Sequence, residues 1–132
     1  MRFDVDRLSQ LLEATGMVDF GFLLGSAQNG EVREGSDLDV AVMYSLGVKV
    51  DFDAMACIYR IVDQVAPGVE CDLIRLNAAS ESIRFEALKG QLLFVKNGCM
   101  ERYMQFYSIT CREYEDYRAW SARQLKYREI KL

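Results

Sequence analysis

Two aspartates one residue apart, Asp37 and Asp39, open an apolar run that also contains Leu38 and Val40. Side chains alternate between the two faces of a strand, so the two carboxylates point one way and the two apolar side chains the other. Carboxylates held side by side repel each other unless a cation lies between them. Ligation by oxygen alone suits magnesium, which in proteins commonly joins carboxylates to nucleotide phosphates. The pattern therefore predicts a site for a metal ion and a nucleotide.

Two further features of the chain complete this candidate site. Gly25 and Ser26 end the preceding apolar run, where glycine lets the backbone approach a phosphate closely and serine offers a hydroxyl and an N–H. Asp72 lies in a third apolar run, where a carboxylate needs a partner or a function. If the second and third runs are neighbouring strands, Asp72 falls beside the first two carboxylates. Three carboxylates can hold two magnesium ions, which clamp the attacking and leaving oxygens of an in-line phosphoryl transfer.

The elements that must position these residues follow from periodicity and from start and stop signals. We expect helices over 4–14, 52–66, 80–89 and 101–131, and strands over 18–24, 37–44, 69–76 and 92–96. The expected apolar stripe of the second helix is Phe52, Met55, Ala56, Tyr59, Val62 and Val65. That of the last helix is Met104, Tyr107, Cys111, Tyr114 and Tyr117. This order predicts an α+β, α/β-like fold, with a small mixed β-sheet flanked by helices and a long C-terminal helix.

Composition excludes several classes of function. The chain of 132 residues has no histidine and four widely spaced cysteines, so neither a zinc site nor a Ser-His or Cys-His nucleophile is expected. The net charge of −4 argues against strong nucleic-acid binding, which needs a basic surface. No apolar run is long enough to cross a membrane, and the first residues lack a signal-peptide pattern, so we expect a cytoplasmic protein.

The motif Gly25-Ser26, Gly30, Ser36-Asp37-x-Asp39, with the downstream strand around Asp72, resembles the polymerase-β-type nucleotidyltransferase superfamily. Its minimal nucleotidyltransferase (MNT) branch is the most similar in size, and the resemblance covers roughly residues 5–95. It implies a polymerase-β palm-like fold, with a nucleotidyltransferase domain over 1–98 and a helical extension over 99–132 that packs on the same domain.

The resemblance also implies roles for individual residues. Gly25 and Ser26 would bind the triphosphate of ATP or another nucleotide, and Asp37 and Asp39 would bind two magnesium ions. Asp72 would bind metal or activate the acceptor hydroxyl. Ser36 has two interpretations, a turn cap or a phosphate contact. Arg33 also has two, a solvated loop residue or a phosphate ligand.

Small proteins of the MNT branch are often antitoxins of HEPN-domain toxins, and the resemblance implies transfer of AMP from ATP to a toxin tyrosine. We expect the distal, basic half of the last helix to recognise a partner protein, because aromatic residues and arginine are enriched at interface hot spots. A homo-oligomer is a further candidate assembly.

Two alternatives remain open at this point. Many family members have an arginine immediately before the third glycine, where this chain has Asn29 before Gly30. That difference leaves room for a non-catalytic module that masks a toxin by contact or binds a nucleotide. An aminoglycoside-type nucleotidyltransferase is disfavoured because such enzymes usually add a further helical domain.

Overall fold

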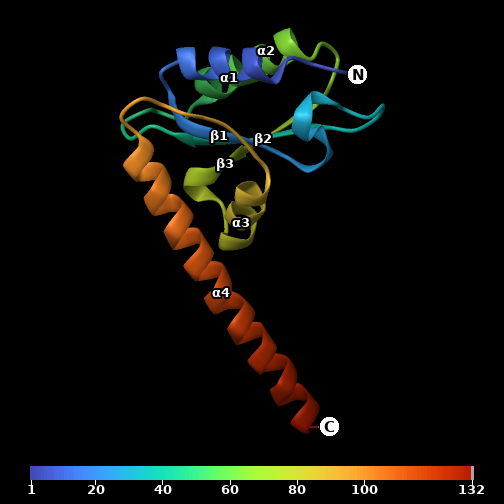
Figure 1. Cartoon of the computed structure of the whole chain (residues 1–132), viewed down its shortest axis with the longest axis vertical. Coiled ribbons are helices and arrows are strands. Elements are labelled where there is room, and N and C mark those ends of the chain that lie inside the picture. Colours follow the sequence, from blue (N-terminus) through green and yellow to red (C-terminus); the bar gives the residue numbers. More distant parts are fainter. Residues whose placement is uncertain (132) are drawn as a thin grey trace.

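A central β-sheet with helices on both of its faces positions the acidic residues (Figure 1). The computed structural model describes residues 1–131, with all their side chains except those of Ser26 and of residues 127–131. The helices are α1 (Val5–Ala14), α2 (Phe52–Val65), α3 (Glu81–Lys89) and α4 (Met100–Lys131), with short 3-10 helices η1 (Gly25–Gly30) and η2 (Leu76–Ala78). The strands are β1 (Val18–Leu24), β2 (Leu38–Tyr44), β3 (Cys71–Arg75) and β4 (Gln91–Val95).

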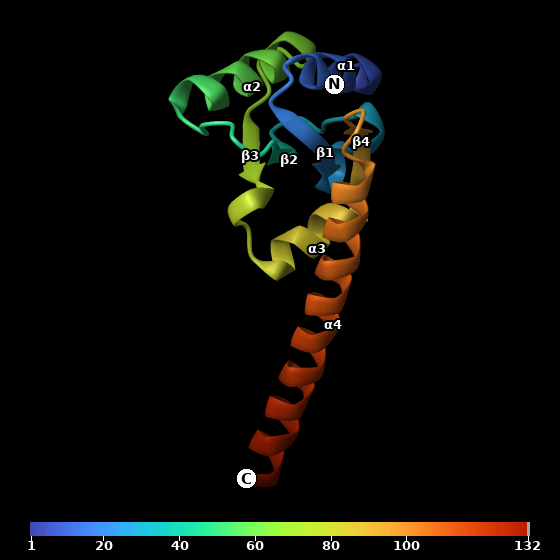
Figure 2. The same cartoon turned by 90° about the vertical axis from the view of Figure 1, so that its left-hand side faces the viewer.

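The sheet is mixed, in the strand order β3-β2-β1-β4 (Figure 2). Strand β1 pairs antiparallel with both β2 and β4, whereas β2 and β3 run parallel. The parallel pair is connected through α2, as a crossover between parallel strands requires. The prediction of a small mixed sheet flanked by helices, with a long helix at the C-terminus, is confirmed.

Local sequence signals explain where the helices begin. The side chain of Asp4 accepts a hydrogen bond from the Arg7 N–H, and that of Asp51 accepts one from the Ala54 N–H. Ser80 caps α3 in the same way. Such caps satisfy N–H groups that have no partner inside the helix. Because these signals are local, the predicted helix bounds agree with the structure to within a residue or two.

Two hydrophobic cores lie on opposite faces of the sheet. Helices α1 and α2 cover one face, where Leu12 and Ile58 pack with Val40 of β2. Helix α3 and the first part of α4 cover the other face, where Ala87 and Phe106 pack with Phe20 of β1. Alternate residues of β1 and β2 therefore serve different cores, which makes these two central strands apolar on both sides.

The predicted apolar stripes of two helices are partly confirmed: Val62 and Val65 of α2 are buried and Tyr114 of α4 is half-buried, but other predicted positions are off by one or two residues. Ala54, Ile58 and Ile61 are buried in α2, while Phe52 is 82% exposed. In α4, the side chains that meet the sheet are Tyr103 and Phe106. The predicted Met104, Tyr107 and Tyr117 are exposed instead. A helix rotates by 100° per residue, so large exposed aromatic or sulfur-containing side chains displace a stripe assigned from hydrophobicity alone.

A buried ion-pair cluster attaches the start of α4 to the sheet. Asp19 of β1 is 4% exposed and accepts hydrogen bonds from Arg102 of α4 and from the Ser45 hydroxyl. The Lys96 Nζ lies 3.5 Å from the same carboxylate, and Arg102 also donates to the Tyr44 carbonyl at 3.2 Å. Burial opposes ionisation of Asp19, but these hydrogen bonds outweigh it and hold the pKa of the carboxyl below its ordinary value.

Among the described residues, no helix is long and apolar enough to cross a membrane. The four cysteines are free thiols, and all are partly buried.

Candidate active site

The sheet places two of the predicted carboxylates opposite each other. Asp39 of β2 pairs with Asp72 of β3 in the parallel register, and with Leu24 of β1 in the antiparallel one. Neighbouring strands lie about 5 Å apart, and side chains at paired positions project from the same face. Asp37 stands one residue before β2. The strands thus bring residues 37, 39 and 72 to one end of the β2–β3 pair.

The burial of the neighbouring side chains determines which face of the sheet Asp39 occupies. Leu38 and Val40 are buried with α1 and α2, while Ala41 belongs to the core on the other face. Because side chains alternate, Asp39 lies on the face of Ala41, beyond the end of that core. Asp39 is half-buried, whereas Asp37 and Asp72 are exposed.

The carboxylates influence one another electrostatically. Burial raises the pKa of Asp39 above its ordinary value, and the negative charges of Asp72 and Asp37 raise it further. Burial, with the charges of the same three carboxylates, raises the pKa of the Cys71 thiol to about 12. The ion pairs among the described residues involve Glu86 and Asp19 as acids, and none of the three site carboxylates. The site therefore concentrates negative charge that a cation could neutralise.

Gly25 brings the backbone close to Asp39. Its φ is +64°, in the left-handed region that glycine adopts at little cost, and an added Cβ would lie 3.4 Å from Asp39 Oδ2. Farther along η1, the Asn29 N–H donates to Gln91 Oε1 at 2.8 Å. Gly30 packs so tightly that an added Cβ would lie 2.7 Å from the Phe3 carbonyl oxygen. The segment before α1 and strand β4 thus hold the turn, and Gly25 lies beside Asp39.

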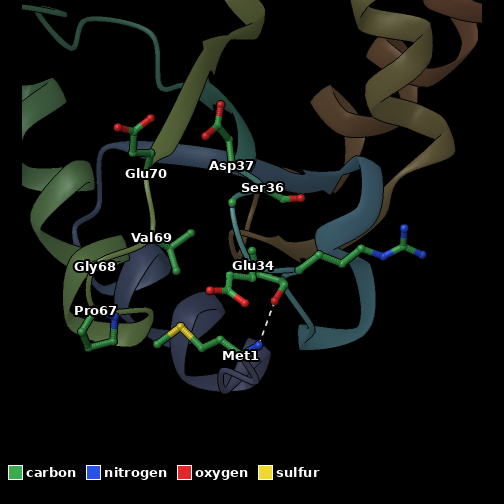
Figure 3. A pocket seen from close by; sticks show the side chains of 11 residues that line it. Met1, Glu34, Ser36, Asp37, Pro67, Gly68, Val69 and Glu70 are labelled. Carbon is green, nitrogen blue, oxygen red and sulfur yellow. Dashed lines mark hydrogen bonds between the residues drawn. The ribbon is translucent and has the colours of Figure 1, made fainter.

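The side chain of Ser26 lies outside the described part of the structure, and only its place in η1 is established. Ser36 and Arg33 line a pocket of about 650 Å³ between residues 32–37 and 67–70, which shares Asp37 with the carboxylate cluster (Figure 3). The Ser36 N–H donates to the Arg33 carbonyl at 3.0 Å. The pocket also has Asp37 and Glu70 in its wall, and their side chains extend to the same side of it, away from Met1. Glu70 is exposed, and its carbonyl accepts a hydrogen bond at 2.8 Å from the N–H of Leu38, the residue that follows Asp37.

The donor set fits magnesium in its chemistry. As the side chains lie, no three histidine, cysteine or acidic side chains in the described part of the chain converge closely enough to hold an ion. Asp37 and Asp72 are exposed, so their side chains can rotate toward Asp39 without disturbing the core. Carboxylate oxygens are the ligands that magnesium prefers, and no lysine or arginine forms an ion pair with the three carboxylates among the described residues.

Comparison with known proteins agrees with this geometry. The family model described as polymerase beta, nucleotidyltransferase matches residues 6–98. A comparison with curated protein sequences finds no match. Among solved structures, a chain of a variant of the MntA–HpeT toxin–antitoxin complex has a TM-score of 0.70 at 19% identity, with 98% of this chain and 99% of that chain covered.

Two other solved structures have the same fold. A chain of a toxin–antitoxin complex with AMP-PNP has a TM-score of 0.69 at 21% identity, over 98% of this chain and 99% of that one. A chain of the complex of tri-AMPylated HEPN toxin with MNT antitoxin from Shewanella oneidensis has a TM-score of 0.57 at 20% identity, over 94% and 99%. The family model spans most of the chain and includes every predicted site residue. The chain therefore belongs to the polymerase-β nucleotidyltransferase family.

Proposed function

We propose that this chain is a magnesium-dependent nucleotidyltransferase that moves AMP from ATP to a tyrosine hydroxyl of a HEPN-domain toxin and so acts as a cytoplasmic antitoxin. One observation carries the proposal: Asp39 lies directly opposite Asp72, close to Asp37 and beneath Gly25, with no cationic side chain paired to any of the three among the described residues. A structural role for these carboxylates would leave their mutual repulsion uncompensated.

The solved structures of the same fold support the choice of nucleotide and acceptor. One complex contains AMP-PNP, an analogue of ATP, and another contains a HEPN toxin that carries AMP. These facts describe those proteins. The shared fold and the three carboxylates are the grounds for extending them to this chain.

In the proposed reaction, the acceptor oxygen forms a bond to the α-phosphorus of ATP while the bond to the β-phosphate oxygen breaks and pyrophosphate leaves. Asp37 and Asp39 would hold magnesium, which would neutralise the charge on the phosphates and on the departing pyrophosphate. Asp72 would bind a cation or take the proton of the acceptor hydroxyl. Gly25, without a side chain, leaves room for the triphosphate beside Asp39, and Ser26 and Ser36 are the proposed donors to its oxygens.

The test combines nucleotide binding with transfer. Calorimetry of ATP with the purified chain should show binding that requires magnesium, and the Asp39→Asn variant should lose this requirement together with most of the affinity. Incubation with radiolabelled ATP and the purified HEPN protein should label that protein, and tyrosine should be the labelled residue in a peptide map. Glu13→Gln removes an exposed carboxylate of α1, away from the site, and is the matched control. Label that persists in Asp39→Asn, or that requires no magnesium, contradicts the proposal.

A second candidate is a module that masks a toxin by contact alone, and Asn29 in the position of the family arginine favours it. The same variant separates the two functions. If Asp39→Asn still protects cells that express the toxin, contact suffices; if protection is lost while the complex still forms, transfer is required.

A further inference from the structure

A second pocket lies at the far end of β2 from the three carboxylates. It measures about 380 Å³ and is formed where the end of β2, η2, α3 and the first half of α4 meet (Figure 2). None of the described residues in its wall belongs to the candidate active site. Met43, which is part of this wall, lies four residues after Asp39 on the same strand, at a distance of about 13 Å along it. The buried Ala41 lies between them, so the two sites are separate.

Two arginines line this pocket, and backbone carbonyls hold both guanidinium groups in place. Arg84 donates from Nε and Nη2 to the carbonyls of two residues of η2, at 3.1 and 3.3 Å. Arg102 donates to the Tyr44 carbonyl at 3.2 Å and also to the Asp19 carboxylate. The side chain of Asn77 connects the two arginines, because it bonds to the Tyr44 N–H and carbonyl at 2.9 and 3.1 Å. Guanidinium groups anchored in this way keep their direction before any ligand binds.

Both guanidinium groups retain donors that these bonds do not use. Each carries more N–H groups than the acceptors named above can occupy. In the described part of the chain, Arg84 forms no ion pair and lies over the Phe106 ring, 5.7 Å from its centroid. Asp19 is shared between Arg102 and Lys96, so the cations around the pocket outnumber this carboxylate. Unused N–H groups and an excess of positive charge suit an anion.

The rest of the wall indicates which kind of anion fits. Met43 and Phe106 are 6% and 7% exposed, whereas Leu46 and Ile109 at the rim are 85% and 45% exposed. Among the described residues that form the wall there is no lysine, hydroxyl or glycine. Those are groups with which proteins commonly bind phosphate. A planar carboxylate instead matches the fork of a guanidinium, and an apolar body attached to it would cover the exposed rim.

We propose that this pocket binds a carboxylate attached to a short apolar body. The unused N–H groups of Arg84 and Arg102 hold the carboxylate, and Leu46 and Ile109 contact the apolar body. A small organic acid presents this chemistry, and so does an acidic side chain flanked by apolar ones in a partner protein. The binding involves no residue of the proposed active site, and it does not depend on the proposed transfer of AMP.

Titration of the full chain with hexanoate, followed by NMR of the backbone amides and the arginine Nε–H groups, tests the pocket. We expect signals of Arg84, Arg102 and Ile109 to shift, with a Kd on the order of 1 mM. Hexanamide has the same chain and a planar head without charge, and inorganic phosphate has charge without an apolar body. Each should bind about tenfold more weakly than hexanoate. If either binds as tightly as hexanoate, or if hexanoate shifts none of these signals, the proposal is overturned.

A variant of the exposed wall residue Gln105 tests the location of the binding. Gln105→Glu adds a negative charge at nearly constant size, so hexanoate should bind about threefold more weakly. Gln64→Glu makes the same change at an exposed position of α2, on the other side of the sheet, and is the matched control. Urea denaturation checks that both variants keep the stability of the wild type. Equal affinities of the two variants for hexanoate would overturn the assignment to this pocket.

Two peptides distinguish the sources of the carboxylate. The tripeptide Leu-Glu-Leu, capped at both ends, carries one carboxylate between two apolar side chains, and capped Leu-Gln-Leu is its neutral counterpart. If the glutamate peptide binds more tightly than both its counterpart and hexanoate, the pocket receives an acidic segment of a partner protein. If hexanoate binds more tightly than both peptides, the ligand is a small organic acid.

Discussion

The two ends of the β1–β2 ladder carry buried or half-buried carboxylates in opposite electrostatic situations. At one end, Asp19 is surrounded by Arg102, Lys96 and the Ser45 hydroxyl, and its pKa lies below the ordinary value. At the other end, Asp39 faces Asp72, and its pKa lies above the ordinary value. The same pair of strands therefore holds a carboxylate with its counter-charge at one end and a carboxylate without one at the other.

The difference separates a structural carboxylate from a functional one. A buried ion pair that is fully hydrogen-bonded fixes the position of the elements that contribute to it. Here it fixes the start of α4 on the sheet. An uncompensated cluster is unfavourable in the isolated protein and becomes favourable when a cation binds. Removing a carboxylate should therefore have opposite effects on stability at the two ends.

The largest expected effect follows from removal of the compensated carboxylate. Asp19→Ala leaves Arg102 and Lys96 without their acceptor at a largely buried position, so we expect a loss of about 2–3 kcal/mol in the free energy of unfolding. Urea denaturation measures it, with Asp53→Ala, an exposed carboxylate of α2, as the control. A loss as small as that of the control would show that the cluster does not stabilise the attachment of α4.

An effect of the opposite sign is expected for the uncompensated carboxylate. Asp39→Asn should raise the free energy of unfolding in the absence of metal, by less than about 1 kcal/mol because solvent screens half-exposed charges. Addition of magnesium should stabilise the wild type and leave this variant unchanged. A marked loss of stability in Asp39→Asn would assign Asp39 a structural role.

The pH dependence of stability should differ in sign between the two ends. The pKa of Asp39 is raised on folding, so its unfavourable contribution develops as pH rises from the unfolded value of 3.8 through the higher folded value. The stability gained by Asp39→Asn should thus be present at pH 7 and absent near pH 3. The pKa of Asp19 is lowered, so its favourable contribution is present above 3.8 and disappears as pH falls through the folded value. Urea denaturation of Asp39→Asn, Asp19→Ala and the wild type between pH 3 and pH 7 measures the two profiles.

The smallest expected difference in stability is that between two glycine variants, one of which lies beside the uncompensated end. Gly25→Ala and Gly47→Ala both place a side chain at positive φ, so each should cost about 1 kcal/mol in stability. At Gly47 nothing lies within 4 Å of the added Cβ, whereas at Gly25 the Asp39 carboxylate lies at 3.4 Å. Only Gly25→Ala should therefore weaken ATP binding in calorimetry. Equal affinity in the two variants would place the triphosphate elsewhere.

Local signals allowed most of the secondary structure to be predicted. Caps such as Asp4 and Asp51 act within one turn of helix, and the alternation along residues 38–44 reflects the two faces of one strand. The buried faces of α2 and α4 were harder to predict. Phe52 and Tyr117 are as hydrophobic as many core residues, and their exposure depends on which neighbouring elements happen to lie over them.

In the candidate site, too, some features follow from the sequence alone and others depend on the tertiary structure. The spacing of Asp37 and Asp39 places two carboxylates on one face of any strand, so the sequence by itself determined the feature on which the prediction of a metal–nucleotide site rests. The partnership of Asp39 with Asp72, and that of Asp19 with Arg102, join residues distant in the chain. The strand order β3-β2-β1-β4 decided that Asp39 meets Asp72, and the packing of the start of α4 against the sheet decided that Asp19 meets Arg102. The physical reason is that charge compensation depends on distance in space, which sequence periodicity does not encode.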